Sequence, residues 1–319
     1  MKKRLAVIDL GTNTCNLLIA DCEKGKLFPV HKDRQPVKLG CEDGLKTGVV
    51  CPEAIQRTLE GLHRYKKAVI GYSVPRNNII LLATAAVRGA TNKESLIHRI
   101  KEETGFDVTV IEGETEATLI YYGAKHDGTL GDTTSLIMDI GGGSTEFIIG
   151  TNEKILWRHS FKLGVSALLQ EIKPDDPMKC NDIKKTVSYL TRRLEPLTDA
   201  VAKYKPHTLI GTSGAFKTLT NLILMHLHQI DKPKKSQYYE VSNSDFRIIY
   251  RELMISNLNQ RLKMKGMEPY RAEFMPMSVL FIKFVMKKYM LQTLIRSSSG
   301  IKEGATLKYF CDEEIDDKE

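Results

Sequence analysis

The sequence has few of the features that identify metal-thiolate sites, membrane proteins or nucleic-acid-binding proteins. Its six cysteines form no Cys-x-x-Cys pair, so neither a zinc site nor a redox dithiol is indicated, and reduced thiols are expected. No apolar run approaches the length of a transmembrane span. The run that starts at Leu5 ends at Asp9, which is too short for a signal peptide. Aromatic residues make up only 7% of the chain, and no basic helix is interleaved with stacking side chains. We therefore expect a cytoplasmic protein that binds neither membranes nor nucleic acid.

The charge balance, in contrast, is strongly basic. The 319 residues include 47 Lys and Arg and 39 Asp and Glu, which gives a net charge of +8. Residues 312–319 carry six acids and one Lys, so the rest of the chain has a charge of +13. This charge favours a phosphate-rich small molecule or polymer as a partner. The alternative is an ordinary solvated basic surface. The length favours two domains.

The stretch 136–150 carries the clearest chemical signal in the chain. A run typical of a buried strand ends at Asp139, three glycines follow, and Glu146 lies in a second strand that is expected to pair back on the first. Asp139, at the mouth of a buried strand, is placed to hold a hydrated magnesium ion on a bound anion.

The glycines of this stretch predict a phosphate site. Without side chains at Gly141, Gly142 and Gly143, backbone N–H groups can approach the oxygens of an anion closely. The hydroxyl groups of Ser144 and Thr145 can add further donors. The structural alternative is a tight glycine hairpin with a capping Asp, because glycine-rich turns are common.

An offset of 130 residues reveals a second copy of the same design at residues 6–20. Asp9 corresponds to Asp139 and Thr14 to Ser144, and apolar positions match on both sides of the turn. Two such hairpins in one chain imply two similar halves that face each other and grip the phosphates of a ligand between them. The alternative is two unrelated glycine turns.

Three carboxylates are concentrated where a strand predicted at 107–111 meets the next helix. Glu112, Glu114 and Glu116 would repel one another, and the positive end of a helix offsets part of that repulsion. Simple enrichment of acids at a helix start is the alternative. An earlier strand, predicted at 79–83, leads to Arg88.

Residues 208–217 repeat the arrangement of strand, glycine turn and helix start that binds anions. Gly214 lies in the turn and Lys217 on the helix that follows. Two further helices are predicted over 246–262 and 272–290.

These motifs make the chain resemble the exopolyphosphatase and guanosine pentaphosphate phosphohydrolase (Ppx/GppA) family. They run in the order of the family over nearly the whole chain, and the Asp-Ile-Gly-Gly-Gly-Ser-Thr-Glu stretch is highly specific. The resemblance implies an α/β fold of the actin-like ATPase type, a duplicated ribonuclease-H-like fold with two domains around a cleft. The matching stretches are residues 7–14, 83–88, 111–120, 137–146, 211–217 and 302–304.

The resemblance also implies the domain limits. We expect residues 1–124 to form the first domain and 125–300 the second. A helix at about 301–311 is expected to pack back on the first domain, and 312–319 to form an acidic tail.

Residue roles follow from the same resemblance. Glu116 matches the glutamate that activates the attacking water, and Arg88 matches a phosphate-binding arginine. Asp139 and Glu146 match the acids around a Mg²⁺ or Mn²⁺ ion, and Asp9 is the corresponding acid of the first half. The other expected phosphate-binding residues are Thr12, Asn13, Thr14, Gly141, Gly142, Gly143, Ser144, Thr145, Gly214 and Lys217.

The implied activity is metal-assisted hydrolysis that releases terminal orthophosphate from inorganic polyphosphate. The same residues can accept the 5′ end of guanosine pentaphosphate, and the sequence does not decide between the two substrates. A phosphate or nucleotide sensor without turnover and a sugar or carboxylate kinase of the same fold are the alternatives, and a homodimer is left open. Thr118 and Lys302 stand where the family commonly has arginine, whose planar fork binds phosphate differently from lysine.

Overall fold

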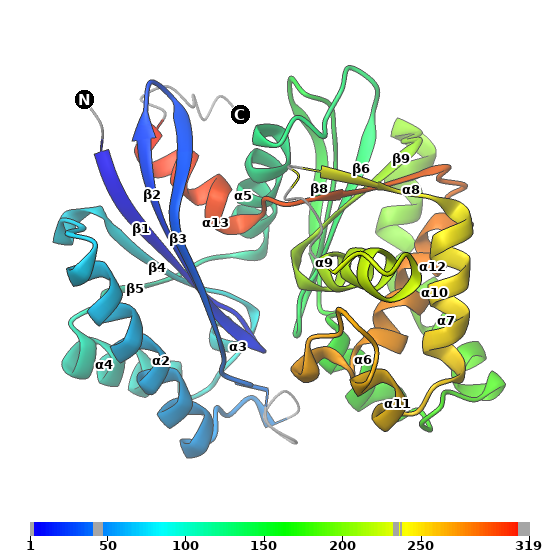
Figure 1. Cartoon of the computed structure of the whole chain (residues 1–319), viewed down its shortest axis with the longest axis horizontal. Coiled ribbons are helices and arrows are strands. Elements are labelled where there is room, and N and C mark those ends of the chain that lie inside the picture. The colour runs from blue at the N-terminus through cyan, green and yellow to red at the C-terminus, as the bar shows by residue number, and fades with distance from the viewer. Residues whose placement is uncertain (1–2, 41–46, 232–235, 237, 312–319) are drawn as a thin grey trace. The chain divides into compact units, whose positions relative to one another are not determined.

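The computed structural model describes residues 3–40, 47–231, 236 and 238–311, and the chain forms two compact α/β units (Figure 1). The first unit takes its described residues from 1–123 and 300–319, and the second is 124–299. The acidic tail expected at 312–319 lies outside the described residues. No helix in the described part of the chain has the length and apolar character needed to cross a membrane.

The first unit is built on a five-stranded sheet with the order β3-β2-β1-β4-β5. β1, β2 and β3 form an antiparallel meander, and β4 and β5 continue the sheet parallel to β1. The strands are β1 (Lys3–Leu10), β2 (Thr14–Glu23), β3 (Lys26–Pro36), β4 (Ile79–Ala83) and β5 (Val108–Val110).

Helices cover both faces of this sheet because both faces of its central strand are apolar. Ala6 and Ile8 of β1 share a core with α2 and α4, while Leu5 and Val7, which point to the opposite face, are equally buried. On the sheet, α13 contacts β1 and β2. The helical segments are α2 (Pro52–Gly71), η1 (Arg76–Asn78), α3 (Ala85–Arg88), α4 (Lys93–Thr104), α5 (Gly113–His126), α13 (Ile301–Thr306) and η4 (Leu307–Cys311).

The second unit repeats this topology. Its six-stranded sheet has the order β10-β11-β9-β6-β7-β8, in which β6, β7 and β8 form the meander, β9 and β11 extend it in parallel, and β10 adds an antiparallel edge. This recurrence is the duplicated ribonuclease-H-like fold, and the predicted fold class is confirmed. The strands are β6 (Ser135–Ile140), β7 (Thr145–Gly150), β8 (Ile155–Phe161), β9 (Thr208–Thr212), β10 (Tyr238–Val241) and β11 (Thr293–Ser297).

One predicted helix of the second unit is divided. The apolar pattern over 246–262 predicted a single helix, but Ser256 has an extended backbone and Asn257 starts a new helix with a capping box to Gln260. The helical segments of this unit are α6 (Val165–Ile172), α7 (Cys180–Arg193), α8 (Glu195–Tyr204), α9 (Ser213–Asn221), η2 (Leu222–Leu227), α10 (Asn243–Ile255), α11 (Leu258–Leu262), η3 (Pro269–Arg271) and α12 (Met275–Lys288).

Glycines allow α13 to approach α5 closely in the first unit. A Cβ atom on Gly304 would lie 1.7 Å from the carbonyl oxygen of Leu119, and one on Gly123 would lie 2.3 Å from that of Gly300. Such distances leave no room for a side chain. The helix α13 is therefore packed directly on the helix that carries Glu116.

The cysteines differ from the sequence-based expectation. Cys22 and Cys51 each take part in a disulfide bond, so the expectation of reduced thiols throughout is wrong, because spacing along the chain does not show which thiols meet in space. Cys15 and Cys180 are free, and burial raises the pKa of the Cys15 thiol. A cytoplasmic location stays a prediction.

Candidate functional site

The turn between β6 and β7 has an ordered set of free backbone donors. The carbonyl groups of Gly141, Gly142 and Gly143 accept hydrogen bonds from the backbone at the start of α6, from Val165, Ser166 and Gly164 respectively, at 2.9 to 3.2 Å. The N–H groups of Gly142, Gly143 and Ser144 have no acceptor among the described residues. A turn whose carbonyls are engaged and whose amides are open favours an anion.

Gly164 makes this arrangement possible. A Cβ atom at this position would lie 2.2 Å from the carbonyl carbon of Gly142, so only glycine lets the start of α6 lie on the turn. The turn is closed at its base by a 3.0 Å hydrogen bond from the Gly141 N–H to the Ser144 carbonyl. The geometry of the loop is thus fixed by α6 as well as by the two strands.

Two acidic side chains lie on one face of the sheet beside this turn. Asp139 and Glu146 are directly opposite each other on β6 and β7, so their side chains share a face and their Cβ atoms are neighbours. Thr212 of β9 donates a 2.5 Å hydrogen bond to Asp139, and Ser160 of β8 donates a 2.7 Å bond to Glu146. The hydroxyl donors hold both buried carboxylates in place.

This pair fits a hard cation that is completed by a ligand. No group of three or more His, Cys, Asp or Glu residues able to hold a metal ion occurs in the described ranges. Magnesium differs from zinc in that proteins usually hold it through one or two carboxylates, with water and phosphate oxygens filling the other positions. Asp139 and Glu146 supply that donor set.

Thr145 differs from its neighbours in the loop. Its side chain is fully buried, and its hydroxyl group donates a 2.9 Å hydrogen bond to the carbonyl of Leu163. The hydroxyl proton therefore supports the chain segment that leads into α6. In Ser144, by comparison, no side-chain hydrogen bond is formed within the described part of the chain.

The first unit has a related arrangement with an amide in place of the second carboxylate. Asn16 lies opposite Asp9 on β2, as Glu146 lies opposite Asp139, and its amide donates a 3.0 Å hydrogen bond to the Asp9 carboxylate. Arg34 of β3 binds the Asn16 oxygen at 2.9 Å. Asp9 thus has a neutral neighbour, and the two halves are not chemically equivalent.

The turn between β1 and β2 is held by the segment that follows β3. The Thr12 carbonyl accepts from the N–H of Leu39, and the Asn13 carbonyl accepts from those of Val37 and Lys38. The Thr14 hydroxyl accepts a 3.3 Å bond from the Asn16 amide. As in the second unit, carbonyl groups of the turn accept hydrogen bonds from a neighbouring segment of the chain.

Arg88 and Glu116, which the sequence placed far apart, are brought together. Arg88 follows β4 at the end of α3, and Glu116 lies in the first turn of α5. An Arg88 Nη1 atom is 3.2 Å from Glu116 Oε2 and donates a 2.7 Å bond to the Ile111 carbonyl. Arg88 thus orients the carboxylate of Glu116, a residue that is only 8% exposed.

A cation that the sequence analysis missed lies against the start of α9. The guanidinium group of Arg271 lies on Gly214, so a Cβ atom there would be 1.7 Å from Nη2. Arg271 donates a 2.9 Å bond to Glu268, which also pairs with Lys217 at 3.0 Å. The two cations thus share one carboxylate beside the helix start. Arg271 lies outside the glycine motifs. The only sign of it in the sequence is its position just before a long apolar helix.

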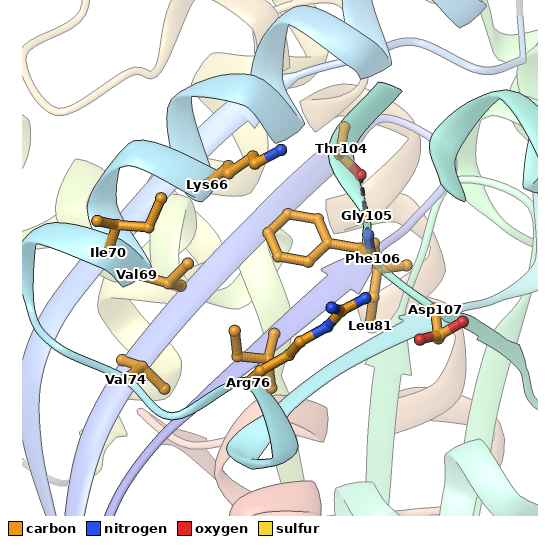
Figure 2. A pocket seen from close by; sticks show the side chains of 11 residues that line it. Lys66, Val69, Ile70, Val74, Arg76, Leu81, Thr104, Gly105, Phe106 and Asp107 are labelled. Atoms are coloured by element: carbon orange, nitrogen blue, oxygen red, sulfur yellow. Dashed lines mark hydrogen bonds between the residues drawn. The ribbon is translucent and has the colours of Figure 1, made fainter. Parts of the chain in front are cut away.

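A cavity of about 320 Å³ in the first unit is separate from these residues (Figure 2). Phe106 forms an apolar wall, and the Arg76 side chain reaches toward it. The cavity includes Ile79 at the start of β4 and the residue just before β5. Because Arg88 follows the opposite end of β4, we do not assign this cavity to the candidate site.

Comparison with known proteins identifies the family of the chain. The model of the Ppx/GppA phosphatase family matches residues 18–311. The chain belongs to the Ppx/GppA phosphatase family. The crystal structure of an exopolyphosphatase from Cytophaga hutchinsonii is 35% identical, has a TM-score of 0.91, and is matched over 96% of this chain and 98% of its own.

Two curated relatives are longer than this chain. The bifunctional 3-dehydroquinate synthase/phosphatase of Fusobacterium nucleatum is 30% identical over 95% of this chain and 46% of its own length. The guanosine-5′-triphosphate,3′-diphosphate pyrophosphatase of Vibrio atlanticus is 24% identical over 94% of this chain and 58% of its own. The chain thus spans about half the length of these relatives.

Proposed function

We propose that the protein hydrolyses the terminal phosphoanhydride bond of inorganic polyphosphate and releases orthophosphate. The observation that carries this proposal is the turn at residues 141–144, where open N–H groups lie beside Asp139 and Glu146. The similarity to the Cytophaga hutchinsonii exopolyphosphatase, which is matched over nearly its full length, supports this substrate.

The proposal gives each group one task. Backbone amides of the turn bind the terminal phosphate oxygens, and the Ser144 hydroxyl adds a donor. Glu116, oriented by Arg88, takes the proton of the attacking water. That residues of both units act on one substrate is part of this proposal and is motivated by the internal repeat.

A Mg²⁺ or Mn²⁺ ion held by Asp139 and Glu146 would neutralise charge on the phosphate oxygens when bound. The hydroxyls of Thr212 and Ser160 keep these two carboxylates aligned. Lys217 and Arg271 supply further positive charge near the start of α9, where a phosphate chain can replace water around the two cations.

Phosphate release tests the proposal directly. The protein is incubated with polyphosphate, guanosine pentaphosphate or ATP in the presence of Mg²⁺ or Mn²⁺, and orthophosphate is measured. We expect release from polyphosphate that stops when the metal is chelated. Release from ATP alone would contradict the proposal, and binding of polyphosphate without release from any substrate would identify a sensor.

Guanosine pentaphosphate is the second candidate substrate. The observation that favours it is the similarity to the Vibrio atlanticus pyrophosphatase over 94% of this chain. A higher kcat/KM for pentaphosphate than for polyphosphate in the same assay would select this function. Both substrates present a terminal phosphoanhydride, so the assigned residues keep their tasks.

A further inference from the structure

The second unit carries a cluster of cations on two neighbouring helices, α10 and α12. Arg247 and Arg251 are four residues apart on α10, and Lys283 and Lys287 are four residues apart on α12, so each pair lies on one helix face. The two helices contact each other, and all four side chains are exposed. None of the four forms an ion pair with another described residue.

The charges of this α10–α12 cluster act on one another, as expected for residues on two helices in contact. The pKa of Lys283 is lowered, first by partial burial and then by the positive charges of Lys287, Arg247 and Arg251. Like charges that lie close together repel one another, and this repulsion lowers the stability of the protein when no ligand is bound. A bound polyanion would remove that cost.

The cluster offers charge without a surface for base stacking. The Lys283 ammonium group lies 3.7 Å from the centroid of the Tyr250 ring, so the lysine covers the aromatic side chain of the cluster. Single-stranded nucleic acid is usually held by open aromatic rings as well as by cations. A phosphate chain without bases needs only the cations.

The position of the two lysines along α12 sets the length of ligand that can reach the cluster. Lys283 and Lys287 lie eight and twelve residues after Met275 at the start of α12, which corresponds to about 12 and 18 Å along the helix. Arg271, whose guanidinium lies on Gly214, comes just before that start. A ligand of three phosphates held near Arg271 is too short to reach the cluster, whereas a long chain is not.

We propose that the α10–α12 cluster is a secondary binding site for the distal part of a long polyphosphate chain, away from the phosphate that is removed. This inference rests on the proposed function and adds a second contact for the same polymer. It predicts that long substrates are bound more tightly than short ones and that this difference depends on the four cations.

The test replaces Arg247, Arg251, Lys283 and Lys287 with Gln in one variant. We expect KM for long-chain polyphosphate to rise roughly tenfold, because each cation that neutralises a phosphate adds to affinity through counterion release. KM for tripolyphosphate and kcat for both substrates should stay unchanged. The melting temperature should not fall, since the change removes repulsion.

A matched variant controls for net charge. It replaces the four exposed cations of α7, Lys184, Lys185, Arg192 and Arg193, with Gln, and we expect both KM values to stay near those of the parent. An equal rise in KM in both variants, or a rise for tripolyphosphate as well, would overturn the secondary site.

Binding to a protein without turnover separates this inference from the proposed function. Fluorescent long-chain polyphosphate is titrated into the E116Q protein with and without the four α10–α12 substitutions. A loss of affinity with the substitutions supports the secondary site, even if the parent protein hydrolyses no substrate. Absence of hydrolysis by the parent protein would refute only the proposed activity. Unchanged affinity, or tighter binding of single-stranded DNA of equal charge, would overturn the inference.

Discussion

Among single residues, Glu116 has the most sharply defined expected role. E116Q keeps the size of the side chain and its hydrogen bond from Arg88 but removes the base, so turnover should fall by roughly 10² to 10⁴-fold, the usual effect of losing a general base. Binding of polyphosphate should survive. Phosphate release at saturating metal measures the first effect and fluorescence titration the second.

Glu114 provides the matched control for this prediction. It lies two residues earlier in the first turn of α5 and is also acidic. We expect E114Q to retain turnover within a few-fold of the parent. If E116Q remains active and E114Q does not, the role of base passes to Glu114.

Glu303 should make stability depend on pH. Burial alone would raise the pKa of its carboxyl group, but Lys302, Lys32 and the Gly300 N–H lower it to about 2. Since this pKa lies below the unfolded value of about 4.3, the stabilisation is complete above pH 4.3 and is lost as the pH falls toward 2. E303Q should therefore be less stable by about 3 kcal/mol at pH 7, and the difference should shrink below pH 4.

Urea unfolding at pH 7, 4 and 3 measures this difference. The exposed Glu153 provides the control, because E153Q should leave the unfolding midpoint unchanged at each pH. A difference between the parent and E303Q that stays constant down to pH 3 would show that the carboxylate charge is not the source of the stabilisation.

The sequence predicted which residues form the turns better than what their side chains do. Asp139 and Glu146 could be paired because a glycine hairpin fixes the strand register. The contacts of the Thr145 hydroxyl and the Arg271 guanidinium could not be predicted, because their partners, Leu163 and Gly214, are set by tertiary packing.

At the level of secondary-structure elements, the contact between α13 and α5 should tolerate no side chain at Gly304. G304A places a Cβ atom 1.7 Å from the Leu119 carbonyl, so α13 must move away from the helix that carries Glu116. We expect a loss of roughly 1–3 kcal/mol in unfolding free energy, with reduced turnover. G71A at the end of α2 is the control, because nothing lies within 4 Å of its added Cβ atom.

Thermal unfolding and phosphate release measured on both glycine variants check this prediction. If G304A is as stable and as active as G71A, α13 does not hold α5 in place. The local pattern predicted the apolar helix α12, but it gave no sign of the break at Ser256, because the apolar spacing of α10 continues past that residue.

For the molecule as a whole, the excess of basic residues should make substrate binding depend on salt. Each Lys or Arg that neutralises a phosphate releases condensed counterions, so the affinity of the E116Q protein for polyphosphate should fall steadily as the salt concentration rises. Titrations at several NaCl concentrations measure the slope. A flat profile would show that backbone N–H groups, and not cationic side chains, provide most of the binding.

The duplication of the fold could be predicted because it leaves a repeat at an offset of 130 residues, which carries Asp9 onto Asp139. The same offset carries Glu146 onto Asn16, so the amide that replaces the second carboxylate is visible in the sequence. The contact of Asn16 with Arg34 is not, because it depends on the pairing of β2 with β3.

The discontinuity of the first unit has a consequence for synthesis on the ribosome. Its sheet and most of α5 come from residues before 124, yet α13, which covers them, begins only at Ile301, after the whole second unit has been made. The second unit can therefore fold during translation while the first still exposes the surface around Leu119. During that interval the nascent chain would be a target for chaperones and proteases, and the helix that carries Glu116 would gain its contact with α13 only after the second unit has been synthesised.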